Sequence, residues 1–74
     1  MRALRANLST LAQRLRQQRL ARGFHTYEAL SLVCGVTASQ IGKYERGLLN
    51  PSTANAVKLA QALRVSVEAL TQED

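Results

Sequence analysis

Apolar residues recur three and four positions apart along this chain, which is the spacing of one face of an α-helix. No run of alternating apolar and polar residues is long enough to predict a β-strand. Start and stop signals divide the pattern into five short helices, so the sequence predicts an all-α fold. A core built from 74 residues is normally worth only about 3–5 kcal/mol, which favours support from a partner subunit.

Two helices are expected in the first half of the chain, over residues 10–22 and over Tyr27–Cys34. In the second of them Leu30, Val33 and Cys34 fall at i, i+3 and i+4, and this side is predicted to face the core. The end signals are Gly23 and Gly35, and the N-cap of the second helix is Thr26.

The third helix has the clearest start signal. Thr37 is followed three residues later by Gln40, as in a capping box, so the helix is expected to begin at Ala38 and to end at Arg46. Gly42 lies in its middle, where glycine costs about 1 kcal/mol relative to alanine. The presence of a glycine inside so short a helix therefore requires an explanation.

A fourth and a fifth helix complete the pattern. Pro51 is suited to the first turn of the fourth helix, which runs to Leu63, and Ser66 is expected to cap the fifth. The residues of the fourth helix predicted to point inward are Ala56, Val57, Leu59, Ala60 and Leu63.

Ten lysine and arginine residues against five acidic residues give the chain a net charge of +5. This balance favours a polyanionic partner, nucleic acid first and an anionic membrane second, while a merely basic soluble surface remains an open interpretation. A basic arm over residues 1–9, with Arg2 and Arg5, precedes the helical domain over 10–71, and an acidic tail over 72–74 follows it. The arm is expected either to reach along DNA or to be a frayed terminus.

The sequence offers little with which to build a metal site or an active site. His25 has no second ligand at metal-binding spacing, and Cys34, the single cysteine, falls on the predicted core face. We therefore expect no enzyme, no cofactor, no metal and no small-molecule substrate. A single cysteine excludes an internal disulfide, and neither a signal peptide nor a membrane-spanning apolar run is present, so a cytoplasmic protein is expected.

The second and third helices are joined by a short turn, as in a helix-turn-helix whose second helix enters a DNA major groove. From about Leu11 to Leu70 the chain resembles the Cro and phage-repressor (XRE-like) helix-turn-helix family. The features that match in order are Arg19 four residues before Gly23, GVTASQI at the turn, YERG at the end of the third helix, PS before the fourth, and LAQALRVSVEAL across the last two. The resemblance implies a fold of five short helices like that of the lambda-repressor DNA-binding domain.

One face of the third helix is where the resemblance implies contact with bases. The 100° step per residue puts Ile41 and Tyr44 on one side of the helix. The residues largely on the other side are Ala38, Ser39, Gly42, Lys43 and Arg46. The family's base-reading positions correspond to Ala38, Ser39 and Lys43, with Thr37, Gln40 and Gly42 flanking them. An ordinary solvated face is the alternative. Gly42 is expected to be exposed and to let the backbone approach the bases, or else to be a glycine that a well-capped helix tolerates.

Phosphate contacts are expected at the edges of this unit, from Tyr27, Arg46 and Asn50. Tyr27 stands where the family usually has glutamine, and its alternative role is the edge of the core. Solvated or loop-capping roles are the alternatives for Arg46 and Asn50. The resemblance also implies a structural ion pair between Arg19 and Glu45, tying the first helix to the third.

Two departures from the family pattern stand out. The segment from Gly23 to Gly35 is one residue longer than usual, which puts the entry to the second helix in question. Arg64 stands where the family usually has glycine, so the fourth helix ends either in a left-handed arginine or in some other way.

These features predict a sequence-specific regulator of transcription that binds double-stranded DNA, a repressor or autoregulator acting as a homodimer on a palindromic operator. Val65 and Val67, near the fifth helix, are the expected dimer contacts. The alternative is an antitoxin-type module that neutralises a partner protein and binds DNA for autoregulation. A steep salt dependence of duplex binding would support the first, and tight 1:1 capture of a protein with little DNA affinity the second.

Overall fold

The computed structural model describes residues 10–71, and within that range the chain forms helices and turns with no strand. The predicted all-α fold is confirmed. The helices are α2 (Thr10–Ala21), α3 (Tyr27–Cys34), α4 (Ala38–Glu45), α5 (Thr53–Leu63) and α6 (Val67–Thr71). The basic arm with Arg2 and Arg5 and the acidic tail lie outside the described residues, so the structure says nothing of their expected roles.

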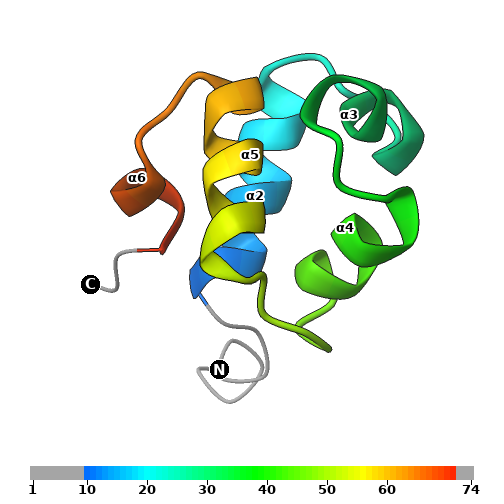
Figure 1. Ribbon diagram of the computed structural model, residues 1–74. Coiled ribbons are helices and arrows are strands. Elements are labelled where there is room, and N and C mark those ends of the chain that lie inside the picture. Colours follow the sequence, from blue (N-terminus) through cyan, green and yellow to red (C-terminus); the bar gives the residue numbers. More distant parts are fainter. Residues whose placement is uncertain (1–9, 72–74) are drawn as a thin grey trace, which may run out of the picture.

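The helices surround one hydrophobic core, and Figure 1 shows how they are arranged. Helix α5 runs through the middle of the view, with α3 and α4 on one side and α6 on the other. Helix α2 packs against α4 and α6, α3 packs against α4 and α5, and α5 packs against α6. The largest fully buried side chains are Leu15, Leu30, Val36, Ile41, Leu59, Leu63 and Leu70. Each of these helices, and the turn between α3 and α4 through Val36, thus contributes to the core against which α3 and α4 pack.

Side-chain oxygens cap four of the helix starts. In each case a hydroxyl accepts a hydrogen bond of 3.0 or 3.1 Å from the backbone N–H three residues later, which satisfies one of the donors a helix start leaves free. The capping residues are Thr26, Thr37, Ser52 and Ser66. The expectation that Pro51 occupies the first turn of the fourth helix was wrong, because Ser52 caps that helix and Pro51 precedes the cap.

The end of α5 is a left-handed arginine, the first of the two alternatives for Arg64. Its φ and ψ are 61° and 42°, a conformation that glycine adopts more easily than any residue with a Cβ. The backbone N–H of Arg64 donates to the carbonyls of Ala60 and Gln61, which closes the helix. From the end of α2, Arg22 donates to the Arg64 carbonyl at 3.4 Å.

One predicted core residue of α3 was misplaced. Leu30 and Cys34 are buried, but the side chain of Val33 is 59% exposed. Helix α3 has only eight residues, and its inner stripe runs through Tyr27, Leu30 and Cys34. Val33 lies on the outer edge of that stripe, beside Leu32, which is 89% exposed. The i, i+3, i+4 pattern identified the correct side of the helix but overestimated the width of its buried stripe.

Candidate nucleic-acid interface

Helix α4 presents one buried face and one exposed face. Ile41, Tyr44 and Glu45 are buried, whereas Ser39 and Lys43 are exposed. Of the remaining positions expected to meet DNA, Thr37 is exposed, and Ala38 and Gln40 are half-buried at the start of the helix. The structure therefore places the predicted reading residues Ser39 and Lys43 one turn apart on open surface, where a helix in a major groove presents its side chains.

Gly42 departs from this arrangement, because it is buried. A Cβ at this position would lie 3.0 Å from Cε2 of Tyr27 and 3.3 Å from Nη1 of Arg46. The prediction that Gly42 lies on the exposed face was wrong. The space above the glycine is occupied by an aromatic ring from the preceding helix, which a helical projection of α4 alone does not reveal. Gly42 therefore lies beneath side chains rather than open to an approaching ligand.

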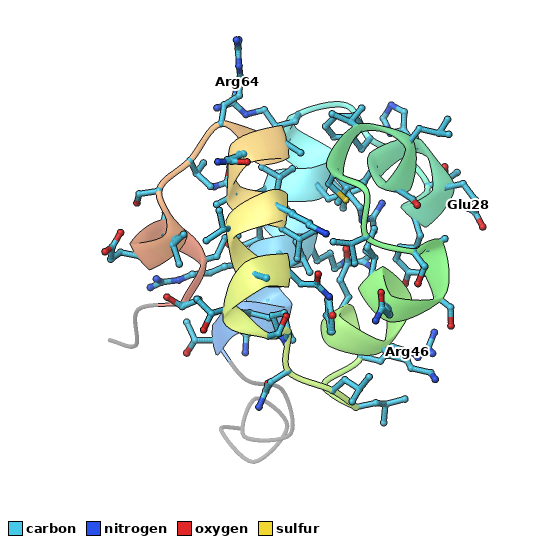
Figure 2. The ribbon with its side chains drawn as sticks, viewed as in Figure 1. Glu28, Arg46 and Arg64 are labelled. Atoms are coloured by element: carbon cyan, nitrogen blue, oxygen red, sulfur yellow. The ribbon has the colours of Figure 1, made fainter. Side chains whose placement is uncertain are left out.

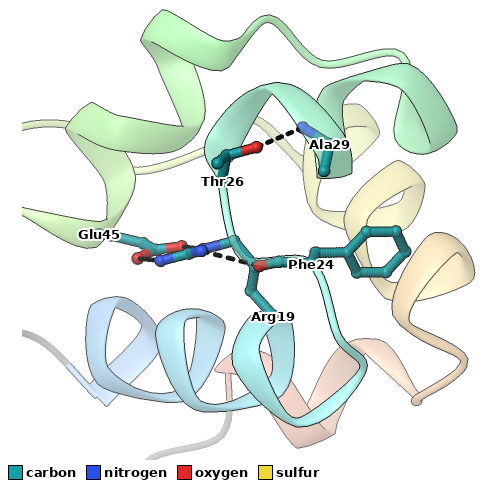
Figure 3. Close-up of polar contacts among 5 residues, drawn as sticks. All are labelled: Arg19, Phe24, Thr26, Ala29 and Glu45. Carbon is teal, nitrogen blue, oxygen red and sulfur yellow. Dashed lines mark hydrogen bonds and ion pairs between the residues drawn. The ribbon is translucent and has the colours of Figure 1, made fainter.

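A buried ion pair between Arg19 and Glu45 holds the buried face of α4 against α2 (Figure 3). Nε of Arg19 lies 2.6 Å from Oε2 of Glu45, and Nη2 donates to Oε1 at 3.0 Å, so the contact is bidentate. Nη1 of Arg19 donates to the Phe24 carbonyl at 2.9 Å. The two side chains are 4% and 2% exposed, so neither charge can be lost without leaving the other unpaired in the core. This is the structural ion pair that the resemblance implied.

Electrostatics and ring packing hold the same arginine in place. The hydrogen bond to Glu45 raises the pKa of Arg19 above its ordinary value, against the opposing effect of burial. The guanidinium carbon lies 4.9 Å from the centroid of the Tyr27 ring, within cation–π range. Arg19 thus links α2 to the first residue of α3 and the last residue of α4.

A second polar contact, which sequence reasoning missed, anchors α4 to α5. Nδ2 of Asn55 donates to the hydroxyl oxygen of Tyr44 at 2.9 Å. This bond gives the hydroxyl of a buried tyrosine the partner that it needs. The only sequence signal was a polar residue, Asn55, on the half-buried side of a helix, and nothing local indicated its partner.

Tyr27, Arg46 and Asn50, the residues expected to contact phosphates, do not form one cluster. Tyr27 is half-buried and packs against the core, as its alternative role required, while keeping part of its surface exposed. Arg46 and Asn50 are exposed beyond the end of α4. In Figure 2, Arg46 projects outward at the end of α4, and Arg64 points away from the far end of α5. Tyr27 and Arg46 both lie over Gly42, with an atom of each within 3.3 Å of where a Cβ would be.

Other expected features can be placed as well. Val65 and Val67 are half-buried and pack against the core. Cys34 is buried. Among residues 10–71, no group of three His, Cys, Asp or Glu side chains is placed to hold a metal ion. Over the same range, no helix is long and apolar enough to cross a membrane.

Helix α4 is exposed on one face, is held by a buried ion pair, and follows the capped helix α3 after a short turn. This is the arrangement of DNA-binding helix-turn-helix proteins. The sequence model of the family described as Helix-turn-helix matches residues 12–70, and the chain belongs to this family. The crystal structure of the restriction-modification controller protein C.AhdI from Aeromonas hydrophila is similar, with a TM-score of 0.79 and 40% identity over 88% of this chain and 97% of that chain. A comparison with curated proteins finds no match. The protein is a DNA-binding transcriptional regulator.

Proposed function

We propose that the protein is a sequence-specific repressor or autoregulator that binds a palindromic operator as a homodimer, inserting α4 into the major groove of each half-site. One observation carries this proposal: Ser39 and Lys43 are exposed on a helix whose opposite face is fixed by the Arg19–Glu45 ion pair. A rigid helix with free polar side chains is the arrangement that reads base edges.

Each exposed residue has a defined role in this proposal. Lys43 donates to O6 and N7 of guanine, Ser39 hydrogen-bonds a base edge, and the Ala38 methyl contacts a thymine methyl. Thr37 and Gln40 flank these contacts. Arg46, Tyr27 and Asn50 hold the DNA backbone, which positions the helix without reading sequence. The regulator acts by occupancy in the cytoplasm, with no catalysis and no cofactor.

The dimer is proposed from the size of the core and from the surface near α6. Val65 and Val67 are only half-buried within the monomer, so a second copy can cover what remains exposed. Two copies related by a two-fold axis would place their α4 helices on half-sites about one helical turn apart. The similarity to C.AhdI leads us to propose that the regulated genes belong to a restriction–modification system.

Selection of bound sites from a random duplex pool tests these statements together. We expect a recovered motif with two-fold symmetry and binding that weakens steeply with salt. Recovery of no motif would contradict sequence-specific binding, and an asymmetric motif would contradict the symmetric dimer.

Capture of a protein partner is a second candidate function, favoured by the exposed apolar side chains of Leu32 and Val33 on α3. Adjacent exposed apolar residues are typical of protein-binding surfaces when they belong to a larger patch. Pull-down with the product of the neighbouring gene tests this function: tight 1:1 capture together with negligible duplex affinity would replace DNA binding as the main role.

A further inference from the structure

Tyr27, the first residue of α3, lies against Gly42 of α4. The Arg19 guanidinium lies over the Tyr27 ring, 4.9 Å from its centroid. An edge of the ring lies over Gly42, with Cε2 only 3.0 Å from where a Cβ would be. Nη1 of Arg46 lies 3.3 Å from the same point. The tyrosine ring and the Arg46 guanidinium therefore converge above one glycine.

Both converging side chains have hydrogen-bonding capacity that the protein does not use. Within residues 10–71, neither the Tyr27 hydroxyl nor the Arg46 guanidinium has a hydrogen-bonded or ion-paired protein partner. Every buried side-chain nitrogen and oxygen atom in that range has a partner, so the Tyr27 hydroxyl must reach solvent. A phenolic donor and a guanidinium that meet on the surface can bind one phosphate together.

We propose that Gly42 is a positioning residue, whose missing side chain lets Tyr27 and Arg46 converge into a joint contact for a single DNA phosphate. The inference rests on the proposed function, in which α4 enters the major groove. It goes beyond that function by assigning the two side chains to one phosphate and by making their contact depend on a residue that does not touch DNA itself.

The surroundings of the ring explain why glycine is needed. A Cβ at position 42 would press on the Tyr27 ring, because 3.0 Å is tighter than an ordinary carbon–carbon contact and the ring would have to give way by a few tenths of an ångström. The ring cannot retreat toward α2, because the Arg19 guanidinium on that side is itself held by Glu45 and by the Phe24 carbonyl. The displaced ring would move relative to Arg46, and the joint contact would be lost.

Gly42→Ala is the direct test, with binding measured against the selected duplex and against a scrambled duplex at several salt concentrations. We expect binding to both duplexes to weaken about 10-fold, with the slope of log K against log salt reduced by about 1. Ser39→Ala, on the same helix, is the matched comparison: it should weaken binding to the selected duplex more than to the scrambled one and leave the salt slope unchanged. Arg46→Ala, which removes one of the two proposed phosphate contacts, is measured in the same way. Arg64→Ala controls for the loss of one positive charge in that variant, since Arg64 projects away from α4 (Figure 2).

A double-mutant cycle tests the joint contact without altering Gly42. If Tyr27 and Arg46 hold the same phosphate, Tyr27→Phe and Arg46→Ala together should weaken binding less than the product of their separate effects. Tyr27→Phe keeps the ring and removes only the hydroxyl, so packing over Arg19 and Gly42 is retained. In this double variant, adding Gly42→Ala should change binding by less than 2-fold, because the contact that it disrupts is already absent.

The outcomes separate the inference from the proposed function. Failure of the unmodified protein to bind any duplex would overturn both. Normal duplex binding with unchanged affinity and salt slope in Gly42→Ala would overturn the inference alone. If circular dichroism shows that Gly42→Ala does not fold, the Tyr27–Arg46 double-mutant cycle tests the inference instead. Independent effects of Tyr27→Phe and Arg46→Ala on duplex affinity would overturn the joint contact, and coupled effects would support it.

Discussion

The two faces of α4 make different demands on their residues. On the inner face, Glu45 and Tyr44 are each tied to another helix by a hydrogen-bonded partner, Arg19 or Asn55. On the outer face, Ser39 and Lys43 are exposed, and no hydrogen bond or ion pair joins their side chains to the rest of residues 10–71.

The difference shows how one short helix can carry both stability and recognition. Partnered groups on the inner face fix the position and tilt of the helix, and unpartnered groups on the outer face retain their hydrogen-bonding capacity for a ligand. Substitutions on the two faces should therefore have separable effects, inner ones on unfolding and outer ones on DNA affinity. Gly42 marks the boundary, since it is buried yet lies beneath the side chains of Tyr27 and Arg46.

The largest expected effect is on the inner face, from Glu45→Ala. This change leaves the Arg19 guanidinium buried without its carboxylate and should lower the free energy of unfolding by about 3–5 kcal/mol. That loss is comparable to the whole stability expected of so small a domain. Urea unfolding followed by circular dichroism measures it. The double variant Arg19→Met with Glu45→Leu is the control and should recover much of the loss; a stably folded Glu45→Ala would mean that the ion pair does not brace α4.

On the outer face, Lys43→Ala should weaken binding to the selected operator by about 1–3 kcal/mol. The midpoint of thermal unfolding should hardly change, because the Lys43 side chain is exposed. Fluorescence anisotropy with labelled duplex, alongside a thermal melt, measures both quantities. Equal losses of stability and affinity would contradict the separation of the two faces.

A smaller inner-face effect is expected from Asn55→Ala, which removes the hydrogen bond to the Tyr44 hydroxyl. The free energy of unfolding should fall by about 1 kcal/mol, the usual net worth of such a bond. Operator affinity, measured well below the melting temperature, should be unchanged. The companion variant Tyr44→Phe should show a similar fall in the free energy of unfolding. Reduced operator affinity in either variant would show that α4 moves when the hydrogen bond between Asn55 and Tyr44 is removed.

The smallest effect should come from Arg64→Gly, on neither face of α4. Glycine relieves the left-handed strain at φ 61° but gains more conformational freedom on unfolding, so a net stabilisation of about 0.5 kcal/mol is expected. Chemical denaturation compared with Arg64→Ala, which keeps the strain, isolates this effect. Destabilisation by glycine would show that the Arg64 side chain contributes more than its backbone costs.

Local signals in the sequence were enough to predict most of the fold. The helix starts after Thr26, Thr37 and Ser66 were predicted correctly because a cap hydroxyl and the N–H that it binds are only three residues apart. Pro51 was misplaced because two start signals, Pro51 and Ser52, stand side by side, and the sequence does not rank them.

Features of the site that depend on distant residues were harder to predict. The projection of α4 placed Ser39 and Lys43 correctly, since the inner face is set by the helix itself. It misplaced Gly42 because the side chain that covers this residue comes from Tyr27, on another helix. The Tyr44–Asn55 bond was missed for the same reason, and the Arg19–Glu45 pair was expected only from family resemblance.

The burial of Cys34 offers a way to time the opening of this domain. It is the single cysteine in the chain, and its side chain is 8% exposed at the end of α3. A thiol reagent must therefore wait for α3 to separate from the core before it can react. The reaction rate at low denaturant reports how often the helix-turn-helix opens, and operator DNA should slow that reaction in proportion to the fraction of protein bound.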